Sequence, residues 1–199
     1  LEEKIQGPEV SVFALCDGER YTLLPTAQDH KRLNEKDKGP NTGGMGAYSP
    51  APLLTEDYLD RIIKEIIEPT INELNKRNID YRGVIYFGLM ITKSGPKVIE
   101  YNCRFGDPEC QTIMPLMDQN FVFLLEKCSM GNLTGDEKIN TSDKVSGCVI
   151  ATSKGYPHEY KTGFQINIGN IDTNDCQIFD SGTSLSEDGK LLTNGGRVL

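Results

Sequence analysis

The sequence contains no tryptophan, only two histidines and no pair of cysteines in the spacing C-x-x-C. Zinc sites are usually built from closely spaced cysteines and histidines, so this composition does not indicate one. Disulfide frameworks are typical of small, cysteine-dense secreted domains, and this chain is neither small nor cysteine-dense. We therefore expect reduced thiols and a cytoplasmic location. The six cysteines are irregularly spaced, at Cys16, Cys103, Cys110, Cys128, Cys148 and Cys176.

Long apolar runs and an excess of positive charge are also missing. A helix that spans a bilayer needs about 20 apolar residues, and the apolar run at 83–92 is much shorter. The formal net charge is −8, whereas proteins that bind nucleic acids or membrane surfaces generally carry a basic patch. These features argue against nucleic-acid and membrane partners. Small phosphorylated ligands are not excluded, because local lysines, arginines or metal ions can balance their charge.

What the sequence does contain is a mixture of strand and helix patterns. Alternating apolar residues predict a hairpin that turns at 17–18, and a second pair of strands that turns at 94–96. A helix capped by Thr55 carries an apolar stripe, and Pro69 should kink it. Another helix should end at Gly131. The predicted strands are 9–15, 21–24, 83–92 and 97–102, and the predicted helices are 55–74 and 121–130.

The rest of the chain predicts a long loop and a small β unit. Residues 25–52 are polar and rich in glycine and proline, without a sustained period, which is typical of a loop that is functional or disordered. The polar segment 132–144 indicates a boundary. We therefore predict an α+β chain with one domain at 1–133 and a small, mostly β domain at 134–199. Short β-prone runs follow the boundary at 148–152, 164–168, 177–179 and 191–193.

The segment 100–104 (Glu-Tyr-Asn-Cys-Arg) is the strongest candidate for a chemical site. Side chains alternate on a strand, so Glu100, Asn102 and Arg104 should share one face, with neighbouring Cα atoms about 6.6 Å apart. A carboxylate and an amide oxygen at this spacing can share a magnesium ion with substrate phosphates. Arg104 could then bind a phosphoryl group or a carboxylate. The alternative is an exposed edge strand with polar alternation.

A glycine-rich stretch at 38–50 is a second candidate. Its glycines let backbone amides approach a ligand, and successive amides can form a nest that binds anions. The spacing of a Walker P-loop is absent. Just upstream, Asp29 could hold an amine, and Lys31 with Arg32 could hold a sugar phosphate. A flexible surface loop and a solvated turn remain the alternatives, and His30 need not be catalytic.

The segment 104–109 (Arg-Phe-Gly-Asp-Pro-Glu) is the third candidate. Pro108 favours the first position of a helix, and Asp107 would cap it. The free amides at such a helix start attract anions. Asp107 could equally serve as a cap and nothing else.

Four stretches resemble the ATP-grasp superfamily and, more closely, the family of phosphoribosylamine–glycine ligases, also called glycinamide ribonucleotide synthetases. Together they extend over the whole chain, and three are long, nearly gapless phrases. The stretches are 27–32 (Ala-Gln-Asp-His-Lys-Arg), 39–48 (Gly-Pro-Asn-Thr-Gly-Gly-Met-Gly-Ala-Tyr), 100–109 (Glu-Tyr-Asn-Cys-Arg-Phe-Gly-Asp-Pro-Glu), and Gly182-Thr183 with 195–199 (Gly-Gly-Arg-Val-Leu).

The resemblance implies a fold and a reaction. It implies part of an ATP-grasp domain, with helices packed on an antiparallel sheet, followed by a small β-rich domain. ATP would phosphorylate glycine to glycyl phosphate, and the amine of 5-phosphoribosylamine would attack it, giving glycinamide ribonucleotide, ADP and phosphate in purine biosynthesis. The cofactors implied are ATP with Mg²⁺ or Mn²⁺. The small-molecule partners implied are glycine, 5-phosphoribosylamine and ATP.

The resemblance also implies roles for individual residues. Glu100 and Asn102 match the metal ligands of the family, and Arg104 with Asp107 match its catalytic residues. The hinge that meets adenine corresponds to Glu2, Glu3, Lys4 and Ile5, and Glu9 corresponds to the acidic residue at the ribose. The pocket for glycine and the sugar phosphate corresponds to Asp29, Lys31, Gly43, Gly44, Met45, Gly46 and Glu109.

Two departures from the superfamily pattern affect these expectations. A second metal carboxylate is usual one strand earlier, where this chain has Gly88. The lid that grips phosphates and the amino-terminal substrate domain would precede Leu1, so we expect a carboxy-terminal fragment that is inactive alone. Two alternatives remain: a nucleotide-binding module without catalysis, and an ATP-grasp ligase for another acid and amine.

Overall fold

The computed structural model describes residues 3–117, 120–137, 139, 143–172 and 176–199. The chain forms two compact units: residues 1–29 with 47–148, and residues 30–46 with 149–199. Segment 30–46 thus groups with the second unit, and the change between units falls after Cys148. The domain boundary between 133 and 134 stays a prediction from the sequence.

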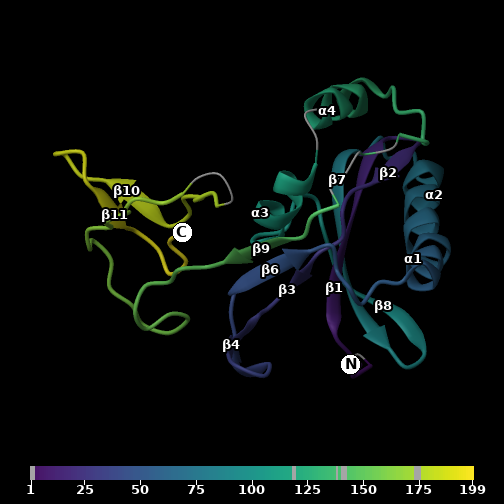
Figure 1. The fold of residues 1–199 in the computed structure, drawn as a ribbon. Coiled ribbons are helices and arrows are strands. Elements are labelled where there is room, and N and C mark those ends of the chain that lie inside the picture. Colours follow the sequence, from purple (N-terminus) through teal and green to yellow (C-terminus); the bar gives the residue numbers. More distant parts are fainter. Residues whose placement is uncertain (1–2, 118–119, 138, 140–142, 173–175) are drawn as a thin grey trace. The chain divides into compact units, whose positions relative to one another are not determined.

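A four-stranded antiparallel sheet forms the centre of the first unit (Figure 1). The predicted strands are confirmed, because long apolar runs pair along most of their length: Glu9 lies opposite Met90 and Asp17 opposite Arg82. The sheet order is β2-β1-β7-β8. The strands are β1 (Glu9–Asp17), β2 (Tyr21–Leu23), β7 (Arg82–Thr92) and β8 (Gly95–Asn102).

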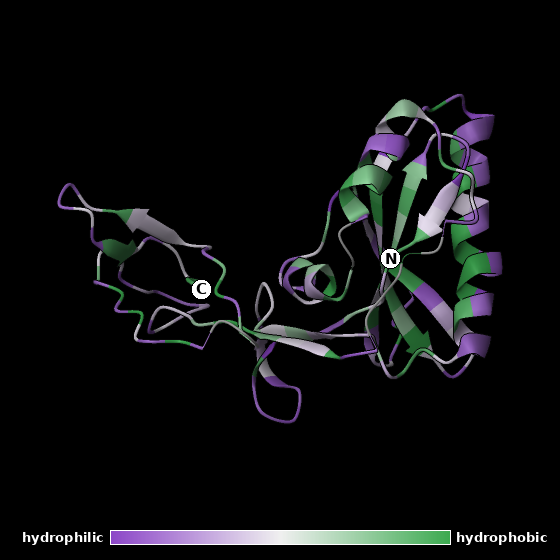
Figure 2. Cartoon of the chain, turned by 45° about the horizontal axis from the view of Figure 1, so that its top comes forward, coloured by the Kyte–Doolittle hydropathy of each residue, from purple (hydrophilic) through white to green (hydrophobic). Residues whose placement is uncertain are grey.

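One face of this sheet is covered by a long helical segment. It comprises α1 (Glu56–Ile62), a π-helical turn (Ile63–Ile67) and α2 (Glu68–Lys76). Hydrophobic and hydrophilic residues alternate around these helices (Figure 2). Their buried isoleucines pack with the sheet. As predicted, the Thr55 side chain caps the start by accepting a hydrogen bond from Tyr58 N.

A π-helical turn directly precedes the segment in which the sequence predicts a kink at Pro69. Proline has no N–H to donate, so the usual hydrogen-bond ladder of a helix is interrupted at this point. The N–H of Glu68, just before Pro69, donates to Ile63 O, five residues back. The wider turn thus carries the helix past the proline.

Shorter helices pack against the apolar part of the opposite sheet face. Phe13, Leu15, Val84 and Tyr86 form a second core with buried residues of this region. The covering elements are α3 (Glu109–Ile113), the 3₁₀ turn Met114–Leu116 and α4 (Phe121–Met130). As predicted, α4 ends at Gly131, whose φ of 72° is a left-handed conformation favoured by glycine.

The region expected to be a long loop contains short strands. The strands β3 (Gln28–Asp29), β6 (Gly46–Ser49) and β9 (Ser146–Val149) form one sheet in the order β3-β6-β9, and β4 (Arg32–Asn34) pairs with β5 (Lys38–Asn41). Strands of two to four residues are too short to show a hydrophobic period. This is why the sequence pattern did not reveal them.

In the second unit, β10 (Thr183–Leu185) pairs with β11 (Leu191–Thr193). The run at 191–193 is therefore confirmed as a strand, whereas 164–168 contributes only an isolated bridge between Gln165 and Leu192. The run at 177–179 is not a strand. The α+β class with an antiparallel sheet is confirmed, and within the described ranges no helix is long and apolar enough to cross a membrane.

Candidate functional site

The sheet face opposite α1 and α2 carries apolar side chains in one part and polar side chains in the other. In one row, Ser11 lies opposite Gly88, which lies opposite Glu100. In the next row, Phe13 lies opposite Tyr86, which lies opposite Asn102. Because β-strand side chains alternate, Glu9, Ser11, Gly88, Glu100 and Asn102 share one face, which we call the polar face.

A β-bulge in β8 places Glu100 on the polar face. Val98 lies opposite Leu89 and Glu100 opposite Gly88, so Ile99 is an extra residue on this strand. Val98 therefore packs into the core with Leu89, although it is two residues from Glu100. On the other face, which packs against α1 and α2, the ring of Tyr101 meets the ring of Phe87 edge-on, with centroids 5.5 Å apart. The structure thus places the side chains of Glu100 and Asn102 on the same side of the sheet.

Gly88 leaves space for the Glu100 side chain. A Cβ atom at this position would lie 2.8 Å from Glu100 Cγ and 3.1 Å from Tyr86 Cε1, both closer than normal packing allows. A carboxylate on Gly88 would therefore displace Glu100. This steric limit agrees with glycine at the place where the sequence analysis notes a missing second carboxylate.

A buried hydrogen-bonded group underlies the polar face. Ser11 Oγ donates to Glu109 Oε1 at 2.9 Å and lies 3.0 Å from Tyr86 Oη. All three residues are buried, with Glu109 only 3% exposed. Burial, followed by the negative charge of Glu109, raises the pKa of Tyr86, so its hydroxyl remains a donor. Ser11 and Tyr86 were missed by the sequence reasoning, although a serine within an apolar strand was a visible signal.

Arg104 and Asp107 lie beyond the end of β8. The strand stops at Asn102, so strand alternation does not determine the direction of Arg104, whose Nη1 donates to Phe105 O at 2.7 Å. The expected cap at Asp107 is wrong: α3 begins at Glu109, and Asp107 Oδ1 instead accepts a hydrogen bond from Gln111 Nε2 at 3.0 Å. The helix has only five residues, so its amino terminus is weak support for an anion site.

The glycine loop, residues 42–46, lies in the second unit and ends at Gly46, the first residue of β6. Its amides are occupied by the protein: Thr42 N donates to Lys31 O, Gly44 N to Thr42 Oγ1 and Met45 N to His30 O. The Gly43 amide donates to Tyr156 Oη at 2.8 Å. The nest hypothesis needs free successive amides, and the structure does not supply them at 42–45.

The other predicted site residues are divided between the units. Glu2 lies outside the described residues, and Glu3, Lys4 and Ile5 precede β1 without regular structure, the first two exposed. In the first unit, Asp29 pairs with Ala47 across β3 and β6. In the second unit, the Lys31 carbonyl accepts from both N and Oγ1 of Thr42. The structure thus brings Lys31 together with the glycine loop, and it places Glu9 on the same sheet face as Glu100 and Asn102, with β7 between them.

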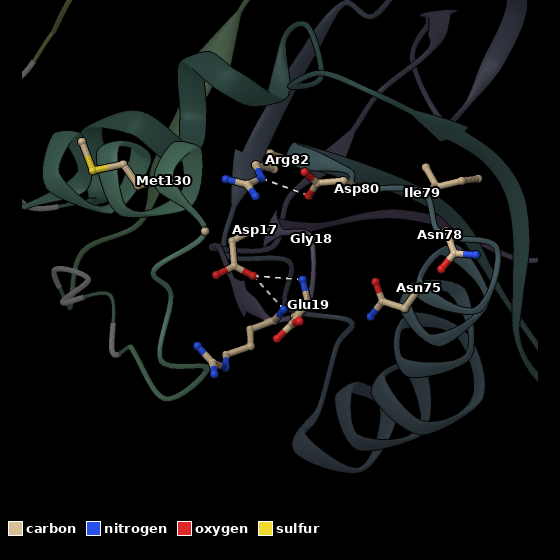
Figure 3. Close-up of a pocket in the computed structure, with 11 residues that line it drawn as sticks. Asp17, Gly18, Glu19, Asn75, Asn78, Ile79, Asp80, Arg82 and Met130 are labelled. Atoms are coloured by element: carbon tan, nitrogen blue, oxygen red, sulfur yellow. Dashed lines mark hydrogen bonds and ion pairs between the residues drawn. The ribbon is translucent and has the colours of Figure 1, made fainter.

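A separate pocket of about 710 Å³ lies around the turn after β1 (Figure 3). Its polar groups are engaged with one another: Asp17 accepts hydrogen bonds from the amides of Glu19, Arg20 and Leu133, and Arg82 pairs with Asp80 at 3.0 Å. None of the predicted site residues lines it. The predicted site residues are therefore separate from this pocket.

Metal binding would depend on few protein ligands. Within the described residues, no group of three or more His, Cys, Asp or Glu side chains is placed to hold a metal ion. Glu100 and Asn102 offer one carboxylate and one amide oxygen from adjacent rows of the sheet. Such a pair suits Mg²⁺, which typically takes one or two carboxylates and completes its shell with phosphate oxygens and water.

The comparisons define first the class of fold and then the family. Residues 1–110 match the family described as phosphoribosylglycinamide synthetase, ATP-grasp (A) domain, so the sheet and its helices belong to an ATP-grasp fold. Residues 146–199 match the C domain of phosphoribosylglycinamide synthetase. The chain therefore belongs to the phosphoribosylglycinamide synthetase family.

Individual relatives agree with this assignment. The chain is 47% identical over its whole length to a phosphoribosylamine–glycine ligase of Caldanaerobacter subterraneus subsp. tengcongensis, covering 47% of that protein. It is 44% identical to the trifunctional purine biosynthetic protein adenosine-3 of Gallus gallus, covering 100% of this chain and 20% of that protein. A phosphoribosylamine–glycine ligase structure from Thermotoga maritima matches with a TM-score of 0.85 and 34% identity, covering 99% of this chain and 48% of that one. The chain thus spans about half the length of such single-function relatives.

Proposed function

We propose that this chain is part of an ATP-dependent ligase that joins glycine to 5-phosphoribosylamine, giving glycinamide ribonucleotide, ADP and phosphate. The observation that carries the proposal is the polar face, where Glu100 and Asn102 project side by side in a chain of the phosphoribosylglycinamide synthetase family. The names of the relatives support the substrate assignment.

The proposed chemistry consists mainly of positioning and charge stabilisation. Glu100 and Asn102 would hold Mg²⁺ or Mn²⁺, which neutralises phosphate charge when bound. Residues 2–5 would meet the adenine, and Glu9 the ribose. Arg104 would stabilise charge on the transferred phosphoryl group, because a guanidinium matches its oxygens in a bidentate fashion.

A further group of predicted residues would bind the substrates other than ATP. Asp29, Lys31 and the glycine loop would bind glycine and the sugar phosphate, together with Asp107. Glu109 would also contribute to substrate binding; its Oε1 accepts a hydrogen bond from Ser11, and its Oε2 lies against Gly106. We place the protein in the cytoplasm, with other parts of the same polypeptide as its partners.

The test is an ADP-release assay on the full-length protein that contains this chain, supplied with ATP, Mg²⁺ and 5-phosphoribosylamine. We expect ADP release to depend on glycine and to disappear when alanine or serine replaces it. Release with another amino acid would favour an ATP-grasp ligase for a different acid. Absence of release with every amino acid would overturn the proposal.

A nucleotide-binding module without catalysis is the second candidate for the 199 residues alone. This candidate is favoured because the chain covers only about half of the relatives' length. The other half of such a ligase would then supply groups that the reaction needs. Calorimetry with Mg-ADP tests it. Measurable binding by a preparation that releases no ADP supports this candidate, and turnover by the 199-residue chain contradicts it.

A further inference from the structure

The backbone of Gly43 is held from two sides by side chains that are distant in the sequence. Its amide donates to Tyr156 Oη at 2.8 Å, and its carbonyl accepts from Arg197 Nη1 at 2.7 Å. All three residues belong to the same compact unit. Both backbone polar groups of this residue are therefore fixed by tertiary contacts and not by a regular ladder of strand hydrogen bonds.

The two side chains are themselves held in place. The backbone of Arg197 bridges Thr152, and its carbonyl accepts from Gly182 N at 2.9 Å. The Tyr156 ring packs against Tyr160, with ring centroids 6.2 Å apart, and a Cβ atom on Gly196 would collide with it. This support fixes the positions from which the phenol and the guanidinium reach the loop.

Gly43 is adapted to this contact. A Cβ atom here would lie 3.1 Å from the guanidinium carbon of Arg197, tighter than ordinary packing. The next residue, Gly44, has a φ of 114°, a conformation that other residues rarely adopt. The loop therefore has one defined conformation, and the Gly43 contacts connect it to the segment 149–199.

We propose that Tyr156 and Arg197 are positioning residues that set the conformation of the glycine loop for the substrates other than ATP. The inference rests on the proposed function, in which this loop belongs to the pocket for glycine and the sugar phosphate. It assigns a role in the reaction to two residues of the carboxy-terminal part, which contact Gly43 of the loop.

The test is steady-state kinetics on the full-length protein carrying Tyr156→Phe, which removes the acceptor for Gly43 N and keeps the ring. We expect the KM for glycine or 5-phosphoribosylamine to rise about fivefold, since one hydrogen bond contributes roughly 1 kcal/mol. The KM for ATP and kcat should stay within about twofold. Arg197→Lys, which retains the charge but not the planar fork, should raise the same KM.

Tyr160→Phe is the matched control, because it removes a hydroxyl from the neighbouring ring and leaves the Gly43 contact intact. Hydrogen exchange at the Gly43 amide gives a readout independent of activity and should accelerate in Tyr156→Phe only. A KM unchanged in Tyr156→Phe, or a KM for ATP that rises in step, would overturn the inference. If the wild-type protein shows no glycine-dependent ADP release, the proposed function itself fails.

Discussion

At the scale of single residues, Gly88 determines which side chain occupies the polar face. It lies between Ser11 and Glu100 in the register, and the Glu100 side chain crosses above it. The position of Glu100 thus depends on a residue without a side chain at position 88. The exposed carboxylate of Glu100 owes its position to this gap and to the bulge at Ile99.

Replacing this glycine tests the steric argument. In Gly88→Ala, the new Cβ would lie 2.8 Å from Glu100 Cγ, so the Glu100 side chain must move. We expect a loss of roughly 1–3 kcal/mol in the free energy of unfolding, measured with urea, together with reduced ADP release. Gly147→Ala is the control, because a Cβ there meets nothing within 4 Å. Equal stability of both variants would contradict the argument.

The buried thiol of Cys16 gives a second prediction at this scale. Burial, followed by the charges of Cys128 and Asp17, raises the pKa of Cys16 to about 12. The raised pKa favours the protonated form in the folded state, so its contribution to stability is fully present below pH ~9 and is lost as the pH rises toward about 12.

Iodoacetamide labelling at pH 8, read by mass spectrometry, checks this assignment. The thiolate is the reactive form of cysteine, so Cys16 should remain unlabelled in the folded protein and react after unfolding. The exposed residues Cys103 and Cys176 should label first. Labelling of Cys16 at the same rate as these two would show that it is not buried as described.

At the scale of elements, the sequence reveals what is long and periodic. The strands β1, β7 and β8 and the helices α1 and α4 follow from alternation, apolar stripes and caps within each segment. The short strands at 28–49 carry too few residues for a period. The bulge in β8 depends on pairing with β7, and a single strand's alternation does not encode it.

Only the part of the candidate site that lies within one segment could be predicted from the sequence. Glu100 and Asn102 stand out because they are two residues apart on a strand. The contact of Ser11 with Glu109 joins segments far apart in the sequence, as does that of Gly43 with Tyr156. Such contacts arise from tertiary packing, so local patterns could not indicate them.

The end of α4 gives a prediction at the element scale. Gly131 has a φ of 72°, and an added Cβ would lie 3.1 Å from Arg82 Nη1. Gly131→Ala should therefore lower the free energy of unfolding by about 1 kcal/mol or more, measured by chemical denaturation. Gly169→Ala, where a Cβ meets nothing within 4 Å, is the control. An unchanged stability of Gly131→Ala would argue against a left-handed cap.

At the scale of the whole molecule, the proposed roles are distributed over two compact units. The first unit carries the polar face proposed for metal and nucleotide, and the second carries the glycine loop with the side chains that hold it. The chain spans about half the length of the phosphoribosylamine–glycine ligases it matches. Activity is therefore a property to be measured on the full-length protein.

The most direct measurement is glycine-dependent ADP release by the full-length protein carrying Glu100→Gln. The substitution keeps the shape of an exposed side chain and removes its charge, so the melting temperature should not change. We predict a loss of at least about 100-fold in ADP release, because the variant lacks the carboxylate that would hold the metal ion at the phosphates. Lys97→Gln, an exposed neighbour on β8, should retain activity. Wild-type rates in Glu100→Gln would contradict the placement of the metal on the polar face.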